Sequence, residues 1–121
     1  MRTPTQVAND YIALWNEMDQ SRRLTMLAGT WTSEATYVDP IMRGKGHSEI
    51  SALVGAVHAK FPGFAFSAIG SADGHGDHVR FSWSLGPAGA EPPIEGSDVV
   101  ALRDGKIADV IGFLDRVPAT T

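Results

Sequence analysis

The chain has 121 residues, enough for one domain around a single hydrophobic core and too few for two. A formal net charge of −4 argues against nucleic acid as a partner, because no basic surface could neutralise a phosphate backbone. The absence of cysteine excludes disulfides, thiol catalysis and cysteine-ligated metals. No apolar run approaches the roughly 18 residues that cross a bilayer, and the N-terminus lacks an apolar signal core. We therefore expect a single domain over residues 1–121, cytoplasmic and without membrane contact.

Helical periodicity predicts three helices before the middle of the chain. The first begins at Pro4, because Thr3 and Gln6 can form a capping box around it. Tyr11 falls on the apolar side of this helix, so its hydroxyl must find a partner in the core or reach a cavity. The third follows Gly46, with His47 or Ser48 as the expected cap. The predicted helices cover, in order, about residues 4–18, 22–31 and 47–61.

Strands are predicted by alternation of apolar and smaller or polar residues, mainly in the second half of the chain. The clearest alternation covers residues 79–85, and an Asp-Gly pair at 104–105 predicts a hairpin between the last two strands. Helices first and antiparallel strands afterwards are typical of an α+β domain, with helices packed on one face of a curved sheet. The predicted strands cover about residues 35–39, 64–68, 79–85, 94–102 and 107–114.

The first of these strands ends in a carboxylate. Tyr37 and Asp39 project to one face of the strand, and Val38 projects to the other. Pro40 disfavours the helical conformation for Asp39 and holds it extended. Asp39 is therefore either a solvated strand end or a base placed beside an aromatic ring.

A second carboxylate lies within a strand that has no plainly polar face. Asp98 shares one face of the strand with Gly96 and Val100, so we expect it to point inward. A buried carboxylate either pairs with a cation, here Arg80 on the neighbouring strand, or stays protonated and donates a hydrogen bond. In the second case Asp98 and the Tyr11 hydroxyl would be two neutral donors that could stabilise an enolate.

The order of these motifs resembles the nuclear-transport-factor-2-like (NTF2-like) superfamily, including its SnoaL-like polyketide-cyclase and ketosteroid-isomerase branches. The resemblance rests on Asp-Tyr-Ile-Ala-Leu-Trp-Asn in the first helix, Ala-Thr-Tyr-Val-Asp-Pro in the first strand, a third helix ending in Phe-Pro-Gly, and four further strands. It covers about residues 3–115. It implies a cone of three helices against a strongly bent, mostly antiparallel sheet, an apolar pocket inside, and a homodimer formed through the sheet.

The ketosteroid isomerases match three positions of this chain. Their catalytic base is the aspartate of an Asp-Pro pair that ends the first strand, as Asp39 does. Their oxyanion tyrosine lies in the middle of the first helix, as Tyr11 does, and their second donor is a protonated aspartate in the position of Asp98. In that enzyme the second carboxyl group is kept neutral so that it can donate. The roles of base and donors come from this resemblance. The chain has only two tyrosines, so an extended tyrosine network behind Tyr11 is not expected.

We expect further pocket residues among the large side chains, with no cofactor and no metal. His75 and His78 bracket a turn but lack a clear third ligand. The residues expected to contact a substrate are Trp15, Met42, His58, Phe61, Phe81, Trp83 and Phe113.

The main hypothesis is an isomerase or cyclase acting on a small apolar carbonyl compound. One alternative is a binding module that holds an apolar metabolite in the same pocket without catalysis. Another is epoxide hydrolysis, for which Arg80 would join Asp39 or Asp98 in an Asp-Arg-Asp set. A third is a scaffold or dimerisation role, favoured if the core aromatics fill the pocket.

Overall fold

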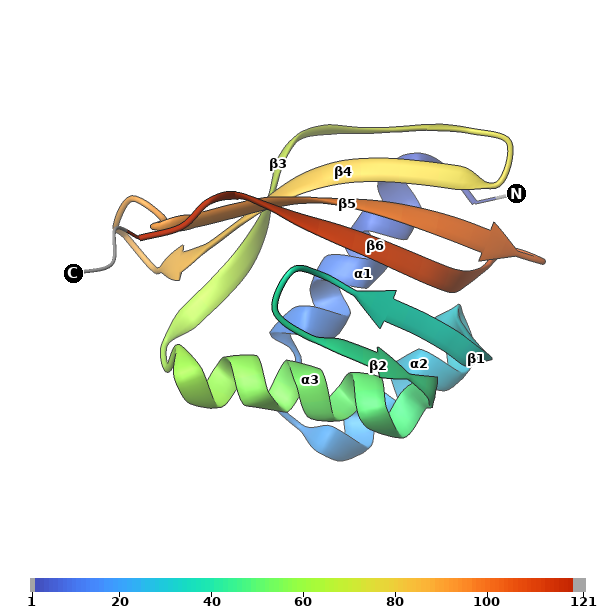
Figure 1. Ribbon diagram of the computed structural model, residues 1–121, viewed down its shortest axis with the longest axis horizontal. Coiled ribbons are helices and arrows are strands. Elements are labelled where there is room, and N and C mark those ends of the chain that lie inside the picture. Colours follow the sequence, from blue (N-terminus) through green and yellow to red (C-terminus); the bar gives the residue numbers. More distant parts are fainter. Residues whose placement is uncertain (1, 119–121) are drawn as a thin grey trace.

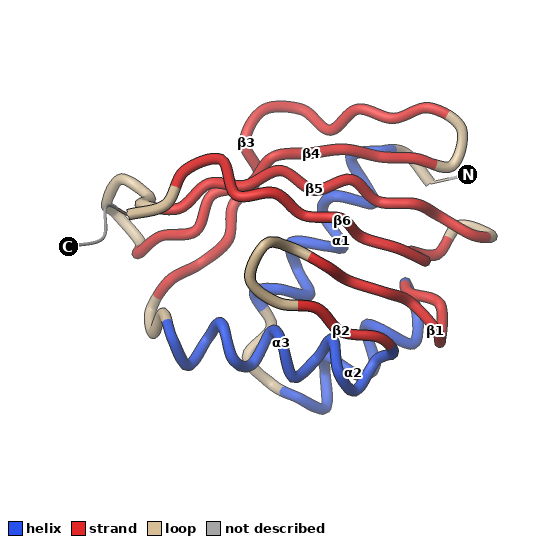
Figure 2. Tube along the Cα trace, in the orientation of Figure 1, coloured by secondary structure: helices blue, strands red, loops and turns tan. Residues whose placement is uncertain are grey.

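The computed structural model describes residues 2–118, which form three helices and one six-stranded sheet (Figure 1). The helices cover one face of the sheet (Figure 2), so the predicted α+β class is confirmed. The elements in chain order are α1 (Pro4–Asn16), α2 (Gln20–Thr30), β1 (Trp31–Val38), β2 (Arg43–Lys45), α3 (Gly46–Lys60), β3 (Phe64–His75), β4 (His78–Pro87), β5 (Ile94–Arg103) and β6 (Lys106–Arg116).

The starts of α1 and α2 follow the expected capping chemistry. The Thr3 hydroxyl accepts a hydrogen bond from the backbone N–H of Gln6 at 3.1 Å, and the Gln6 side chain accepts from the Thr3 N–H at 2.9 Å. Asp19 caps α2 by accepting from the N–H of Arg22 at 3.3 Å. Because α2 ends at Thr30, Trp31 is the first residue of β1 and not the end of a helix.

The predicted cap of α3 is wrong. The helix begins at Gly46, which has a φ of +84° and turns the chain out of β2. His47 instead places its ring Nε2 2.9 Å from the carbonyl oxygen of Thr32. The short strand β2 was not predicted, because three residues are too few to show a period.

The strands are ordered β2-β1-β6-β5-β4-β3, and only β1 and β6 run parallel among these neighbours. The first long strand therefore pairs with the last, which brings β1 next to the hairpin of β5 and β6. β3 is bent where its pairing with β4 shifts between Ile69 and Asp73, beside Gly70 with a φ of +65°. This bend curves one end of the sheet around the helices (Figure 1).

The apolar core lies between the helices and the concave face of the sheet. α1 packs against β3 and β4, and α3 packs against β1. Fully buried members of the core come from both layers, for example Leu14, Leu27, Ile50 and Val110. Within residues 2–118, no helix has the length and apolar character needed to span a membrane.

Candidate functional site

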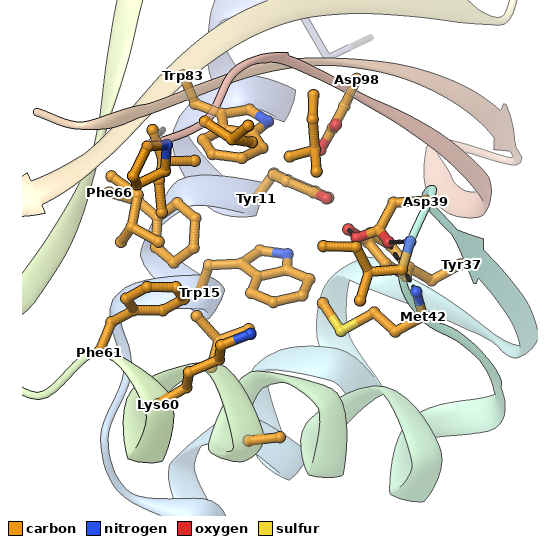
Figure 3. Close-up of a pocket in the computed structure, with 18 residues that line it drawn as sticks. Tyr11, Trp15, Tyr37, Asp39, Met42, Lys60, Phe61, Phe66, Trp83 and Asp98 are labelled. Carbon is orange, nitrogen blue, oxygen red and sulfur yellow. Dashed lines mark hydrogen bonds between the residues drawn. The ribbon is translucent and has the colours of Figure 1, made fainter. Parts of the chain in front are cut away.

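A cavity of about 620 Å³ opens between the helices and the sheet. Its wall is mainly apolar, so the core aromatics do not fill the pocket (Figure 3). The scaffold or dimerisation role was favoured only if aromatic side chains filled the pocket, so the open cavity does not favour it. The lining residues are Tyr11, Trp15, Tyr37, Asp39, Ile41, Met42, Ala56, Val57, Lys60, Phe61, Phe66, Trp83, Leu85, Ile94, Asp98, Leu114, Val117 and Pro118.

Asp39 lies on the cavity wall and is held by three hydrogen bonds. The Tyr37 hydroxyl donates to Oδ2 at 2.6 Å, and the backbone N–H groups of Ile41 and Met42 both donate to Oδ1 at 2.8 Å. The Asp39 N–H in turn donates to the carbonyl of Met42 at 2.9 Å, which closes the turn after β1. A carboxylate has about four acceptor positions, so most of the acceptor capacity of Asp39 is already used.

Asp98 lies in β5, between Phe81 of β4 and Gly112 of β6. The inward orientation predicted for it is confirmed, because the residue is 1% exposed. Its Oδ1 is buried and has no hydrogen-bond partner within residues 2–118. One oxygen of this carboxyl group therefore lacks the partners that both oxygens of Asp39 have.

Gly112 makes room for the two carboxyl side chains to approach each other. A Cβ atom at this position would lie 2.9 Å from Asp98 Oδ1 and 3.2 Å from Asp39 Cβ. Any larger residue would therefore push into the space between them. Sequence reasoning missed this residue, although a glycine in a strand interior is a known sign of close approach.

Burial raises the pKa of Asp98 to about 6. The donor groups of Tyr11 and Trp83 oppose this rise, and the negative charges of Asp39 and Asp115 add to it. Burial thus favours the neutral form of Asp98, which is the form that the donor role implied by the resemblance requires.

The two tyrosines of the chain both line the cavity near Asp39 and Asp98 (Figure 3). Burial, then the nearby charge of Asp98, raises the pKa of Tyr11 well above its usual value. The same two causes raise the pKa of Tyr37. Both hydroxyls are therefore neutral donors at any ordinary pH. Tyr37 was not predicted as a site residue, although its position two residues before Asp39 on the same face is a usable signal.

Four of the seven residues predicted to contact a substrate line the cavity, namely Trp15, Met42, Phe61 and Trp83. Among the described residues, the buried indole N–H groups of Trp15 and Trp83 have no partner within hydrogen-bond distance, although that of Trp83 is near enough to Asp98 to lower its pKa. These two donors add to the other polar groups of a mainly apolar wall (Figure 3), which are those of Tyr11, Tyr37, Asp39, Asp98 and Lys60.

The other three do not line the cavity. The ring Nε2 of His58 lies 2.6 Å from the carbonyl oxygen of Trp15, so His58 links α3 to α1. Phe81 is buried behind Tyr11, with ring centroids 5.0 Å apart. Phe113 is 52% exposed on the face of the sheet that carries no helix.

The position of Phe113 follows from a bulge in β6. Ala101 pairs with Asp109 and Leu102 pairs with Ile107, so Ala108 is an extra residue without a partner in β5. A one-residue bulge reverses which side chains face inward. Beyond it, Val110 and Gly112 face the helices, whereas Ile111 and Phe113 face outward.

Arg80 is not part of the site. Its Nη2 lies 3.3 Å from Oδ2 of Asp73 in an exposed ion pair, and its register partner is the outward-facing Val99. The alternative in which Arg80 pairs with Asp98 is therefore wrong, and Arg80 does not join Asp39 or Asp98 in an Asp-Arg-Asp set for epoxide hydrolysis. Within residues 2–118, no three His, Asp or Glu side chains are grouped so that they could hold a metal ion.

Comparison with known proteins identifies relatives of the same architecture. The family profile of the SnoaL-like domain matches residues 8–110. A proposed isomerase of the SnoaL-like family from Agrobacterium tumefaciens has a crystal structure that is 41% identical. The match covers 94% of this chain and 99% of that one, with a TM-score of 0.89.

Two more distant structures show the fold alone. A proposed ketosteroid isomerase from Kribbella flavida is 16% identical over 98% of this chain and 82% of its own, with a TM-score of 0.70. A proposed SnoaL-like polyketide cyclase from Jannaschia sp. is 17% identical over 95% and 90%, with a TM-score of 0.68. A search of the curated proteins finds no match. From the family profile and the Agrobacterium structure, we conclude that the chain belongs to the SnoaL-like family and has its NTF2-like fold.

Proposed function

We propose that this protein binds a small apolar carbonyl compound in the cavity and isomerises or cyclises it through an enolate. The observation that carries the proposal is that Tyr11, Asp39 and Asp98 line one cavity whose remaining wall is mainly apolar. The isomerase name of the relative from Agrobacterium supports the same class of reaction. The acid–base groups needed for it are all present in the chain.

The proposed reaction needs a base and a donor for the developing oxyanion. A cavity carboxylate takes a proton from the carbon next to the carbonyl, and the electron pair of that C–H bond moves towards the oxygen. The neutral Tyr11 hydroxyl donates a hydrogen bond to the enolate oxygen. The proton then returns at another carbon, which gives an isomer, or the enolate carbon attacks a second carbonyl, which closes a ring.

The resemblance assigns the base to Asp39 and the second donor to Asp98. A neutral Asp98 would strengthen the site for an anionic oxygen below about pH 6. The Tyr11 hydroxyl and the indole N–H of Trp15 are further donors in the cavity wall. The enolate chemistry holds with either carboxylate as the base.

The test combines a binding probe with a turnover assay. A fluorescent bicyclic phenol, whose spectrum reports on its ionisation, should bind wild-type protein and lose about tenfold or more in affinity in Tyr11→Phe, because a donor to the phenolic oxygen is gone. Conversion of a β,γ-unsaturated ketone to its conjugated isomer should be followed by absorbance and should slow in Tyr11→Phe and Asp39→Asn. Unchanged binding and turnover in both variants would contradict the proposal.

The second candidate is ligand binding without catalysis. It is favoured by the three hydrogen bonds on Asp39, which fix its carboxylate as a rigid contact point. In that case Asp39→Asn changes the affinity for the probe, and wild-type protein converts no ketone of a panel that it binds. Turnover by the wild type decides between the two candidates.

A further inference from the structure

The mouth of the cavity is marked by the lining residues that are themselves exposed. These are Ile41 in the loop after β1, Ala56 and Lys60 on α3, and Val117 and Pro118 after β6. The other four are apolar, and Lys60 is the only cation among the described residues that line the cavity. A molecule held in the cavity therefore meets one positive charge, and meets it at the entrance.

The side chain of Lys60 is directed at the cavity. Lys60 is the last residue of α3, and in Figure 3 it rises from the helix towards the ring of Trp15. Its Nζ lies 5.7 Å from the centroid of the Phe61 ring, which is itself part of the cavity wall. At this distance the face of an aromatic ring attracts a cation. The contact therefore holds the ammonium group beside the wall.

No carboxylate of the described residues forms an ion pair with this ammonium group. The ion pairs within residues 2–118 all use arginines. The two carboxylates of the cavity wall, Asp39 and Asp98, lie on the other side of the cavity from Lys60 (Figure 3). The positive charge of Lys60 is therefore available to a negative charge on a bound molecule.

The charges of the cavity favour one orientation of a ligand that has both an apolar body and an acidic group. The Asp39 carboxylate repels an acidic group from its side of the cavity. The apolar part of the wall offers such a group no counter-charge, and an ion placed there loses its hydration. An acidic group therefore has its lowest energy at the mouth, where Lys60 attracts it and water still reaches it. The opposite end of the ligand then points to the Tyr11 hydroxyl.

We infer that the ligand of this cavity carries a carboxylate and that Lys60 binds it at the mouth. The inference rests on the proposed function and narrows its substrate class. The substrate is then a carbonyl compound with an apolar body and a carboxylate at the end away from the reacting carbonyl group. Lys60 acts as a specificity residue and takes no part in proton transfer.

A purely structural role of Lys60 makes a different prediction. A lysine in the last turn of a helix also interacts favourably with the helix dipole. Loss of that interaction would change the stability of α3, and would weaken acidic and neutral ligands alike. A carboxylate site instead acts on acidic ligands alone. The ratio of the affinities for an acid and for its neutral ester distinguishes the two roles.

The test compares a hydroxynaphthoic acid, whose hydroxyl and carboxyl groups lie at opposite ends of the fused rings, with its methyl ester. Homologues with one or two methylene groups before the carboxyl group vary the reach of the charge. We expect the acid-to-ester affinity ratio of the best homologue to fall about three- to tenfold in Lys60→Gln, and to be retained in Lys60→Arg. Lys45→Gln is the matched control, because Lys45 is exposed at the other end of α3 and does not line the cavity. It should keep the wild-type ratio.

Salt gives a second measurement that needs no variant. Added NaCl should lower the affinity of wild-type protein for the acid and leave that for the ester unchanged, because salt screens the attraction to Lys60. The whole chain cannot produce this result, since its net charge of −4 repels the acid and salt would then strengthen binding. An acid that binds more tightly as salt is added would overturn the inference.

The outcomes separate the inference from the proposed function. If the ester binds but every homologue gives the same ratio in wild type and Lys60→Gln, the inference is overturned and the proposed function stands. An equal fall of the ratio in Lys45→Gln also overturns it, because the effect would then be one of overall charge. If wild-type protein binds neither acid nor ester, both are overturned. Each ratio is taken within one protein that binds the ester, so a loss of stability cannot imitate the effect.

Discussion

At the scale of single residues, neighbouring donors and one glycine distinguish two chemically identical side chains. Asp39 and Asp98 both line the cavity, but only Asp39 has hydrogen-bond partners on both of its oxygens. Gly112 lets them approach within a space that even a methyl group would fill. The predicted burial of Asp98 follows from alternation in β5. The backbone donors to Asp39 come from the turn after β1, and hydrophobic periodicity cannot predict the conformation of a turn.

The raised pKa of Asp98 predicts a loss of stability as the pH rises. The folded-state pKa of about 6 lies above the unfolded value near 3.8, so folding favours the protonated form. The contribution is fully present below about pH 4 and is lost as the pH rises through about 6. At one pKa unit per 1.36 kcal/mol, the full effect is at most about 3 kcal/mol.

Urea unfolding of wild type and Asp98→Asn at intervals from pH 4 to pH 7 measures this contribution. The free energy of unfolding of the wild type should fall relative to that of the variant over this range. Parallel pH dependences for the two proteins would contradict a raised pKa at this position.

At the scale of elements, one buried arginine joins all three helices. Arg23 of α2 donates from Nε to the Ser51 hydroxyl of α3 at 3.0 Å. Its Nη1 donates to the carbonyls of Glu17 and Met18, just beyond α1, at 3.0 and 3.2 Å. Since α3 forms one wall of the cavity, this side chain also fixes the position of that wall. No apolar pattern could predict it, because a buried arginine looks like a solvated one in sequence.

Replacing this arginine should destabilise the helix layer. Arg23→Ala removes three hydrogen bonds and leaves the buried Ser51 hydroxyl and two partly buried carbonyls without this donor, so we expect a loss of about 2–4 kcal/mol in the free energy of unfolding. The neighbouring Arg22, with a side chain 76% exposed, is the matched control. Arg22→Ala should change stability by no more than about 0.5 kcal/mol. Equal effects of the two substitutions, measured by urea unfolding, would show that the contacts of Arg23 contribute nothing.

At the scale of the whole molecule, the helix-free face of the sheet carries an apolar strip. Val38, Ile111 and Val99 are register neighbours across β1, β6 and β5, and they are 41%, 51% and 37% exposed. Phe113 extends the strip along β6. We propose that a second copy of the chain covers this surface, as the family resemblance leads us to expect.

A charge placed in this strip should separate the copies. We expect light scattering to give a dimer for the wild type and a monomer for Phe113→Asp. Met18→Asp, which places the same charge at a 71% exposed position off the sheet, should remain a dimer. A monomeric wild type, or a dimer that survives Phe113→Asp, would contradict this assembly.

The global features of the fold were predictable, and the departures have local causes. Capping residues and helical periodicity located α1 and α2, and alternation located β4 and β5. The parallel pairing of β1 with β6 joins residues far apart in the chain, so no local pattern reports it. The bulge at Ala108 moved Phe113 to the outer face. Arg80 alternates with buried residues of β4 and pairs with the outward-facing Val99, so it points away from the cavity.

The central claim is that a cavity carboxylate removes a proton next to a carbonyl group. Hydrogen–deuterium exchange into a small cyclic ketone in D₂O, followed by NMR, reports that step alone and needs no isomerised product. We expect wild-type protein and the control Asp109→Asn, which changes an exposed aspartate bonded to Thr36, to accelerate the exchange. The double variant Asp39→Asn with Asp98→Asn should leave it at the buffer rate. Exchange by the double variant at the wild-type rate, or no acceleration by the wild type with ketones that it binds, would contradict the claim.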